Sequence, residues 1–232
     1  MTNKKFENTL PKIFGQPTAE RSIVVLSPHL DDAVWSLGGL LNELVRTGYR
    51  VEVITVFSQS TFVYDELISS EEATALRKSE NILALRKVGV HREHCLDIPE
   101  GVLRDRALDS IFDAAYALPA HLAQIIGGRL EQLIPQNALV LAPSGFGEHM
   151  DHIALRDLVA ELPYTVIYYE DMPYAARTTR VDGALSYLHS RGYRVRQLLV
   201  DRIVIDNHLE RYKDYISQRK SCLLYTSPSP RD

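Results

Sequence analysis

The sequence has few of the features that mark secreted, membrane-spanning or disulfide-stapled proteins. Its 232 residues include only two cysteines, Cys95 and Cys222, which cannot form a disulfide framework. No segment approaches the roughly 20 consecutive apolar residues that a membrane helix needs. Residues 1–21 also lack the apolar stretch of a signal peptide. These absences favour a soluble, cytoplasmic protein with no transmembrane segment.

An excess of charge of one sign is also missing. The chain has 26 basic and 30 acidic side chains, for a formal net charge of −4, and no basic run is longer than a dipeptide such as Lys4-Lys5. Proteins that hold nucleic acid or anionic membranes by bulk electrostatics need a strong positive excess. We therefore expect no nucleic-acid partner and a small-molecule ligand, while the oligomeric state stays open.

Short apolar runs alternate along the chain with segments of helical periodicity. Strands are expected at 22–27, 51–57, 93–98, 138–142, 165–169 and 198–205. Helices are expected at 37–48, at 69–88 behind a capping-box-like start, at 101–135 with a break at Pro119, at 151–161 and at 208–220. This alternation predicts a Rossmann-like, doubly wound α/β fold, with a largely parallel sheet and helices on both faces.

The last eleven residues, 222–232, match one reading frame of a common transposon-end sequencing adapter, codon by codon. A natural Ser/Pro-rich flexible tail is the alternative. We favour the adapter because eleven consecutive matches are improbable by chance. The expectation is then a single domain at 1–221, cut short at its C-terminus, followed by a translated artefact at 222–232 that includes Cys222.

Two clusters of histidine and carboxylate side chains follow expected strands. Residues 28–32 (PHLDD) come after the first strand, and residues 148–152 (EHMDH) come after the strand at 138–142. Ligands of open α/β sheets bind beyond the carboxyl ends of the strands, so the two clusters should meet. Three nitrogen or oxygen ligands with an open position are typical of a catalytic zinc, and a spare carboxylate could take a proton from its water. Taken singly, each cluster is weak, since an Asp after a strand is often only a helix N-cap.

Both clusters resemble a known family. The run 26–33 (LSPHLDDA), followed by Gly38-Gly39, is similar to the PHPDDE signature of the PIG-L/LmbE-like N-acetylglucosaminyl deacetylases, and 149–152 (HMDH) is similar to their HxDH motif. Segments 169–174 and 215–218 resemble further parts of that family. The resemblance implies a zinc-dependent hydrolase that removes the N-acetyl group from an N-acetylglucosamine-type sugar or conjugate. The aglycone and the pathway stay open.

The resemblance also assigns roles residue by residue. His29, Asp32 and His152 would hold one Zn²⁺, and Asp31 would be the general base that activates its water. His149 would stabilise or protonate the tetrahedral intermediate. Asp151 would orient the His149 imidazole and keep it cationic by raising its pKa. Either Asp31 or His149 could protonate the leaving amine.

Four further positions bear on this assignment. Leu30 and Ala33 stand where the signature has Pro and Glu, and neither is a ligand position. Arg77 and Glu100 resemble substrate contacts of the family. The alternative for Arg77 is a solvated helix residue, because arginine usually keeps its head group in water.

Two other functions share some of these features. A non-haem iron oxygenase also uses two histidines and a carboxylate, although usually as His-x-Asp/Glu on a β-barrel, where this chain has His-x-x-Asp on an α/β pattern. A non-catalytic sugar-binding protein could keep the same fold. Asp31 counts against the second alternative because it is not needed to hold the metal.

Overall fold

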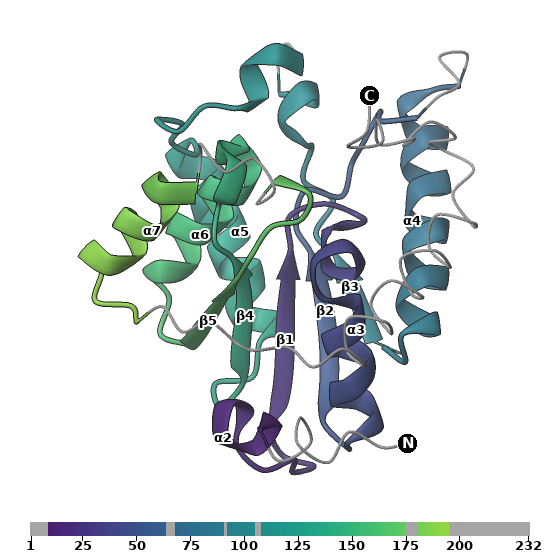
Figure 1. Ribbon diagram of the computed structural model, residues 1–232. Coiled ribbons are helices and arrows are strands. Elements are labelled where there is room, and N and C mark those ends of the chain that lie inside the picture. The colour runs from purple at the N-terminus through teal and green to yellow at the C-terminus, as the bar shows by residue number, and fades with distance from the viewer. Residues whose placement is uncertain (1–8, 64–67, 91, 105–107, 175–180, 195–232) are drawn as a thin grey trace, which may run out of the picture.

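The computed structural model describes residues 9–63, 68–90, 92–104, 108–174 and 181–194. Within them five strands form one sheet in the order β3-β2-β1-β4-β5, and all four neighbouring pairs are parallel. The strands are β1 (Ser22–Ser27), β2 (Arg50–Thr55), β3 (Arg92–Cys95), β4 (Leu139–Pro143) and β5 (Thr165–Tyr169). The predicted α/β fold with a parallel sheet is confirmed (Figure 1).

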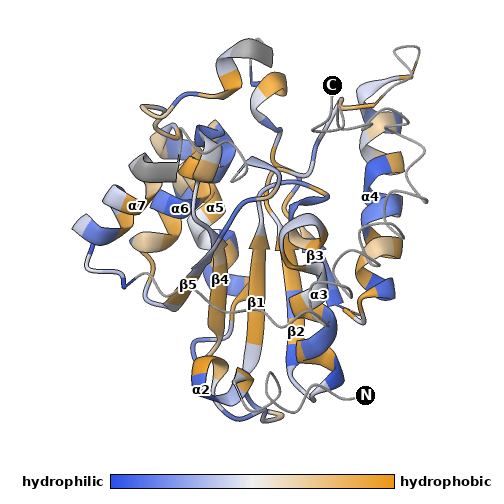
Figure 2. Cartoon of the chain, viewed as in Figure 1, coloured by the Kyte–Doolittle hydropathy of each residue, from blue (hydrophilic) through white to orange (hydrophobic). Residues whose placement is uncertain are grey.

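Helices cover both faces of this sheet (Figure 1). They are α2 (Leu10–Phe14), α3 (Asp32–Arg46), α4 (Ser70–Lys87), α5 (Ala120–Leu133), α6 (Met150–Ala160) and α7 (Val181–Ser190). Successive strand residues point to opposite faces, so Val25 and Val53 pack with α3 and α4, whereas Val24 and Ile54 pack with α5 and α6. Because both faces are covered, the central strands β1, β2 and β4 are apolar along most of their length (Figure 2).

The expected helix over 101–135 is only partly correct. Its second half is α5, which follows the predicted break at Pro119, but the first half contains the short 3₁₀ segments η1 (Gly101–Leu103) and η2 (Leu108–Ile111). The Gly101 N–H donates to the Asp151 side chain, which ties this segment to the strand ends. β3 also stops earlier than predicted, and Asp97 has a left-handed φ of 53°. The strand and helix expected at 198–205 and 208–220, and the tail 222–232, lie outside the described residues.

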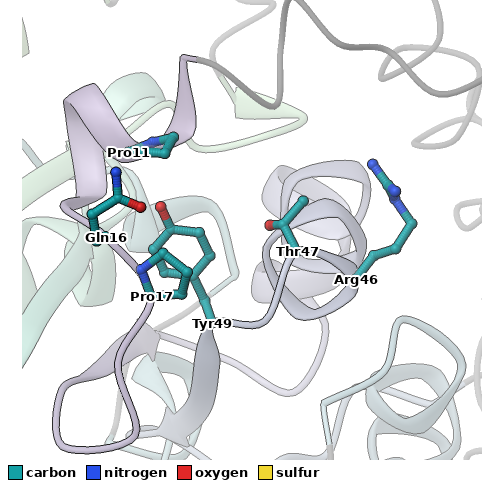
Figure 3. A pocket seen from close by; sticks show the side chains of 6 residues that line it. All are labelled: Pro11, Gln16, Pro17, Arg46, Thr47 and Tyr49. Atoms are coloured by element: carbon teal, nitrogen blue, oxygen red, sulfur yellow. The ribbon is translucent and has the colours of Figure 1, made fainter.

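The described helices include none that is both long and apolar enough to cross a membrane. A surface hollow of about 360 Å³ lies beside α2, at the end of the sheet where β2 begins (Figure 3). Its lining residues are Pro11, Gln16, Pro17, Arg46, Thr47 and Tyr49. None of these six is a histidine, a cysteine or a carboxylate, so this hollow is not the metal site expected from the sequence.

The strand order reverses between β1 and β4, because the chain moves from β1 to β2 and β3 on one side and returns to β4 and β5 on the other. In doubly wound sheets the ligand site lies at this switch point, beyond the carboxyl ends of the strands. The loops leading from β1 to α3 and from β4 to α6 are neighbours there (Figure 1). The fold therefore brings the two clusters of the sequence together, as predicted.

Candidate metal centre

Local hydrogen bonds shape the first cluster. The Ser27 hydroxyl donates to the His29 carbonyl at 2.7 Å and accepts from the Ala33 N–H at 3.1 Å, which closes the turn between β1 and α3. Asp32 Oδ2 accepts from the His29 N–H at 2.8 Å. The same oxygen lies 3.0 Å from His29 Nδ1. The turn therefore holds the imidazole and the carboxylate on one side of the loop.

The second cluster begins with a tight turn, η3 (Phe146–Glu148). Gly145 and Gly147 have φ values of 77° and 79°, and Glu148 follows at 64°. A Cβ on Gly147 would lie 2.4 Å from the Cβ of Tyr174, so the chain passes where only glycine fits. The turn delivers His149 to the N-cap of α6, where its Nδ1 accepts the Asp151 N–H at 3.2 Å. His152 follows within the first turn of the helix.

The two clusters converge on one buried point. His29, His149 and His152 each place a ring nitrogen within 4.8 Å of the others. Asp32 belongs to the same group, because its Oδ2 lies 3.2 Å from His152 Nε2. That Nε2 atom is buried and makes no hydrogen bond with any described residue. A buried nitrogen without a hydrogen bond, beside a second imidazole and a carboxylate oxygen, fits the donor set of a divalent zinc ion.

Two of these histidines, His29 and His152, each contact a fully buried carboxylate through the ring nitrogen that faces away from the site. Asp151 Oδ2 accepts from His29 Nε2 at 2.9 Å. Asp171 Oδ1 lies 2.6 Å from His152 Nδ1, and its other oxygen accepts from the Ser144 hydroxyl and the Phe146 N–H. Carboxylates of this kind fix the orientation of metal-binding imidazoles. The role of Asp171 was not predicted, although an acidic side chain just beyond β5 is the signal that could have pointed to it.

Nearby carboxylates raise the pKa values of both His29 and His152. Burial alone would lower the pKa of His29, but Asp151 and Asp32 raise it well above its ordinary value. Likewise, burial disfavours protonated His152, yet Asp32 and Asp171 raise its pKa to about 9. The same contacts hold the pKa of Asp32 and Asp151 below the ordinary range, against the effect of burial.

The structure contradicts two expectations about His149. Burial, reinforced by the charges of His29 and His152, lowers the pKa of His149 to about 2 and outweighs Asp151, which raises that pKa as expected; the neutral ring is therefore favoured. The Asp151 carboxylate, moreover, contacts His29; only the Asp151 backbone N–H reaches His149. Because Nδ1 of His149 accepts that hydrogen bond, the proton of the neutral ring resides on Nε2.

Asp31 lies next to this group and is held by Arg77. The Arg77 guanidinium lies 3.1 Å from Asp31 Oδ2 and donates to the Phe62 carbonyl. Its side chain is only 4% exposed, so Arg77 is not the solvated helix residue considered as the alternative. Asp31 is the more accessible partner, at 20% exposure.

Glu100 lies in the segment that crosses the same end of the sheet. Its Oε1 accepts from the Ser60 hydroxyl at 2.8 Å and from the Thr61 N–H at 3.1 Å. The next residue, Gly101, donates its N–H to Asp151. Glu100 is therefore connected to the metal centre by one peptide unit and one hydrogen bond. Its expected contact with substrate stays a prediction, as does that of Arg77.

Comparison with known proteins agrees with this geometry. Residues 24–162 match the family described as PIG-L: GlcNAc-PI de-N-acetylase. The chain is 28% identical over 182 residues to a 2'-N-acetylparomamine deacetylase from Streptomyces fradiae, which covers 73% of this chain and 63% of that protein. The chain thus spans less than two thirds of the length of this curated relative.

Solved structures share the fold. A crystal structure of an A40926 pseudoaglycone deacetylase has a TM-score of 0.60 at 23% identity, and the match covers 91% of this chain and 86% of that one. The zinc-inhibited form of a teicoplanin deacetylase has a TM-score of 0.57 at 23% identity, with 85% and 84% covered. The family match includes both histidine clusters and more than half of the sequence, so this chain belongs to the PIG-L family.

Proposed function

We propose that this protein is a zinc-dependent de-N-acetylase, which hydrolyses the acetamido group of an N-acetylglucosamine-type sugar or conjugate to acetate and the free amine. The observation that carries the proposal is the convergence of His29 Nδ1, Asp32 Oδ2 and His152 Nε2 at the switch point of the sheet, with Asp31 beside them. The Streptomyces fradiae relative is named for the deacetylation of an amino sugar, which supports the same class of substrate.

We assign the metal to His29, Asp32 and His152. A zinc ion held there would lower the pKa of a water towards ~7 and polarise the amide carbonyl. His149 also has a nitrogen within reach of the group. However, its neutral ring, fixed through Nδ1, presents an N–H at Nε2, and a protonated nitrogen cannot coordinate a metal. His149 is therefore better suited to donate to the substrate.

Asp31 is the group best placed to move protons. It follows the metal-binding turn directly, it is more exposed than Asp32, and Arg77 holds its side chain in place. A carboxylate in this position can accept a proton from the attacking water and later return it to the leaving amine. Proton uptake and delivery then involve one residue, and His149 need not gain or lose a proton.

His149 stabilises the charge that develops on the carbonyl oxygen. Its ring is buried and flanked by the rings of Phe112 and Tyr174, with centroids 5.6 Å away in both cases. A fixed N–H donor in such a dry environment favours a developing oxyanion more strongly than it would in water. The donor is neutral in this assignment, in place of the imidazolium expected from the sequence.

The test of this function compares Asp31→Asn with His152→Ala. We measure bound zinc together with amine release from a panel of N-acetylglucosamine conjugates. Asp31→Asn should keep zinc and lose roughly 10²–10⁴-fold in turnover, the range typical of a general base. His152→Ala should lose zinc and activity together, and Asp157→Asn, a change in a half-exposed surface carboxylate, serves as the control.

Two outcomes would contradict the proposal. Equal loss of zinc in Asp31→Asn and His152→Ala would show that the roles of ligand and base are wrongly divided. Stoichiometric zinc in the unmodified protein, without amine release from any acetamido sugar, would argue for a different acyl amide or for a binding role.

A further inference from the structure

The two carboxylates that back the histidine ligands differ in their own partners. Asp171 accepts its other hydrogen bonds from neutral groups, the Ser144 hydroxyl and the Phe146 N–H. Asp151 accepts one neutral hydrogen bond, from Gly101, and is also paired with the guanidinium of Arg104. The carboxylate that contacts His29 is therefore paired with a nearly buried cation, whereas the one that contacts His152 is not.

Arg104 is itself held rigidly. Its Nη1 donates to the Pro99 carbonyl at 2.6 Å, and its Nη2 lies 3.4 Å from the Tyr116 hydroxyl. The guanidinium carbon lies 4.9 Å from the centre of the Phe57 ring, within the range of a cation–π contact. The side chain is only 11% exposed. Because arginine is planar and permanently charged, these contacts fix the direction of the donor that reaches Asp151.

The two oxygens of Asp151 are divided between two tasks. Oδ1 pairs with Arg104, while Oδ2 accepts from His29 Nε2 and from the Gly101 N–H, both at 2.9 Å. A carboxylate held at both oxygens cannot rotate about its Cβ–Cγ bond. Oδ2 is then aimed at Nε2 of His29, which leaves Nδ1 as the ring atom that faces Asp32.

We propose that Arg104 is a positioning residue of the metal centre: it anchors the Asp151 carboxylate, which fixes the His29 ring and so tightens the binding of a divalent metal ion. This inference rests on the proposed metal site, because His29 is one of its ligands. Arg104 lies 72 positions from Asp32 in the sequence and outside both histidine clusters.

The direct test is zinc affinity, measured by chelator competition at fixed pH. Arg104→Met keeps the length and the apolar stem of the side chain but removes the donors and the charge. We expect about 10–100-fold weaker zinc binding, as for other groups that support metal ligands. Arg104→Lys can still pair with Asp151 as a point charge, so it should recover most of the affinity. When cobalt replaces zinc, the visible absorption spectrum of Arg104→Met should differ from that of the unmodified protein, and that of Arg104→Lys should differ less.

Arg129→Met is the control for removing an arginine that donates to a backbone carbonyl. Arg129 also donates from Nη1 to a backbone carbonyl, that of Leu96, but its side chain is exposed and it pairs with no carboxylate among the described residues. We expect its zinc affinity to be unchanged. If Arg104 were only structural, Arg104→Met would lower the melting temperature of the metal-free protein and leave zinc affinity and the cobalt spectrum as they were; that result would overturn the proposal.

A second measurement needs neither metal nor substrate. In metal-free protein with ¹⁵N-labelled histidine, the Nε2–H of His29 should give a slowly exchanging signal, assigned by its loss in His29→Gln. The signal should exchange faster in Arg104→Met and persist in Arg104→Lys and Arg129→Met. If these results hold while no acetamido sugar is hydrolysed, the proposed function fails and the role of Arg104 stands. A protein that binds no divalent ion would overturn both.

Discussion

Single residues in the second cluster have different tasks although they are close in sequence. Within four positions, His149 turns its Nδ1 to the backbone, Asp151 reaches across to His29, and His152 faces Asp32 and Asp171. The pattern of residue types predicted that the two clusters meet, and the resemblance to the family pointed to His29, Asp32 and His152 within them. It could not predict that Asp151 serves His29 in place of His149, because that depends on how far two loops approach each other.

Cys95, at the end of β3, gives a prediction at the same scale. Burial, with the charge of Glu93 adding to it, raises the pKa of its thiol from 9.0 to about 11. Because the thiolate is the reactive form, native Cys95 should react with iodoacetamide about 100-fold more slowly at pH 8 than in the unfolded chain. The measurement uses Cys222→Ser, so that only Cys95 reacts.

The raised pKa of Cys95 also sets how stability and alkylation rate change with pH. The folded protein holds the thiol proton more tightly than the unfolded chain, so the contribution of Cys95 to stability is complete below pH 9 and is lost as the pH rises towards 11. Between pH 7 and 9.5 the native alkylation rate should therefore rise about tenfold per pH unit without levelling off. A plateau below pH 9 would show that the thiol is not shifted as described.

Among the helices and strands, those with a regular sequence pattern could be predicted, whereas segments of irregular backbone could not. The capping box at Ser69 and Glu72 marked the start of α4, and both reciprocal hydrogen bonds are present. The segment from Gly101 to Pro119 has enough apolar residues to suggest a helix, yet its described residues contain only the short 3₁₀ turns η1 and η2. Its conformation depends on tertiary contacts with Asp151 that local sequence does not record.

The turn before α6 offers a test of such irregular backbone. In Gly147→Ala, the new Cβ would lie 2.4 Å from the Cβ of Tyr174 and the φ of 79° would strain an alanine. We expect the free energy of unfolding to fall by about 2 kcal/mol or more, measured in urea. Zinc affinity should fall with it, because the turn delivers His149 and His152 to the site.

Gly128→Ala is the control for this change. Gly128 lies within α5, and a Cβ there would meet nothing within 4 Å. Replacing a mid-helix glycine by alanine should raise stability by roughly 0.5–1 kcal/mol. If Gly147→Ala were as stable as the unmodified protein, the turn would be adaptable and its glycine would not be required.

For the whole molecule, the metal centre connects the two halves of the sheet. His29 and Asp32 follow β1, whereas His152 belongs to the helix after β4. A ligand that binds only the folded state stabilises it by about 2.7 kcal/mol at a free concentration 100 times its dissociation constant. Removing zinc with a chelator should therefore lower the melting temperature, and adding zinc back should restore it.

The matched comparison is His152→Ala, which lacks one proposed ligand. Its melting temperature should respond little to zinc or to chelator. An equal response in the variant and the unmodified protein would place the stabilising metal elsewhere in the molecule.

The pairing of distant segments also bears on how the protein is made. His29 and Asp151 are 122 positions apart. β1 pairs with β2 on one side, and its other edge stays unpaired until β4 has been synthesised. As the chain leaves the ribosome, β1 and β2 emerge long before the residues that complete the centre. In the proposed assignment, a metal ion can therefore bind only late in synthesis. Before β4 emerges, a chain of this topology has an unpaired strand edge, a feature that favours aggregation and chaperone binding.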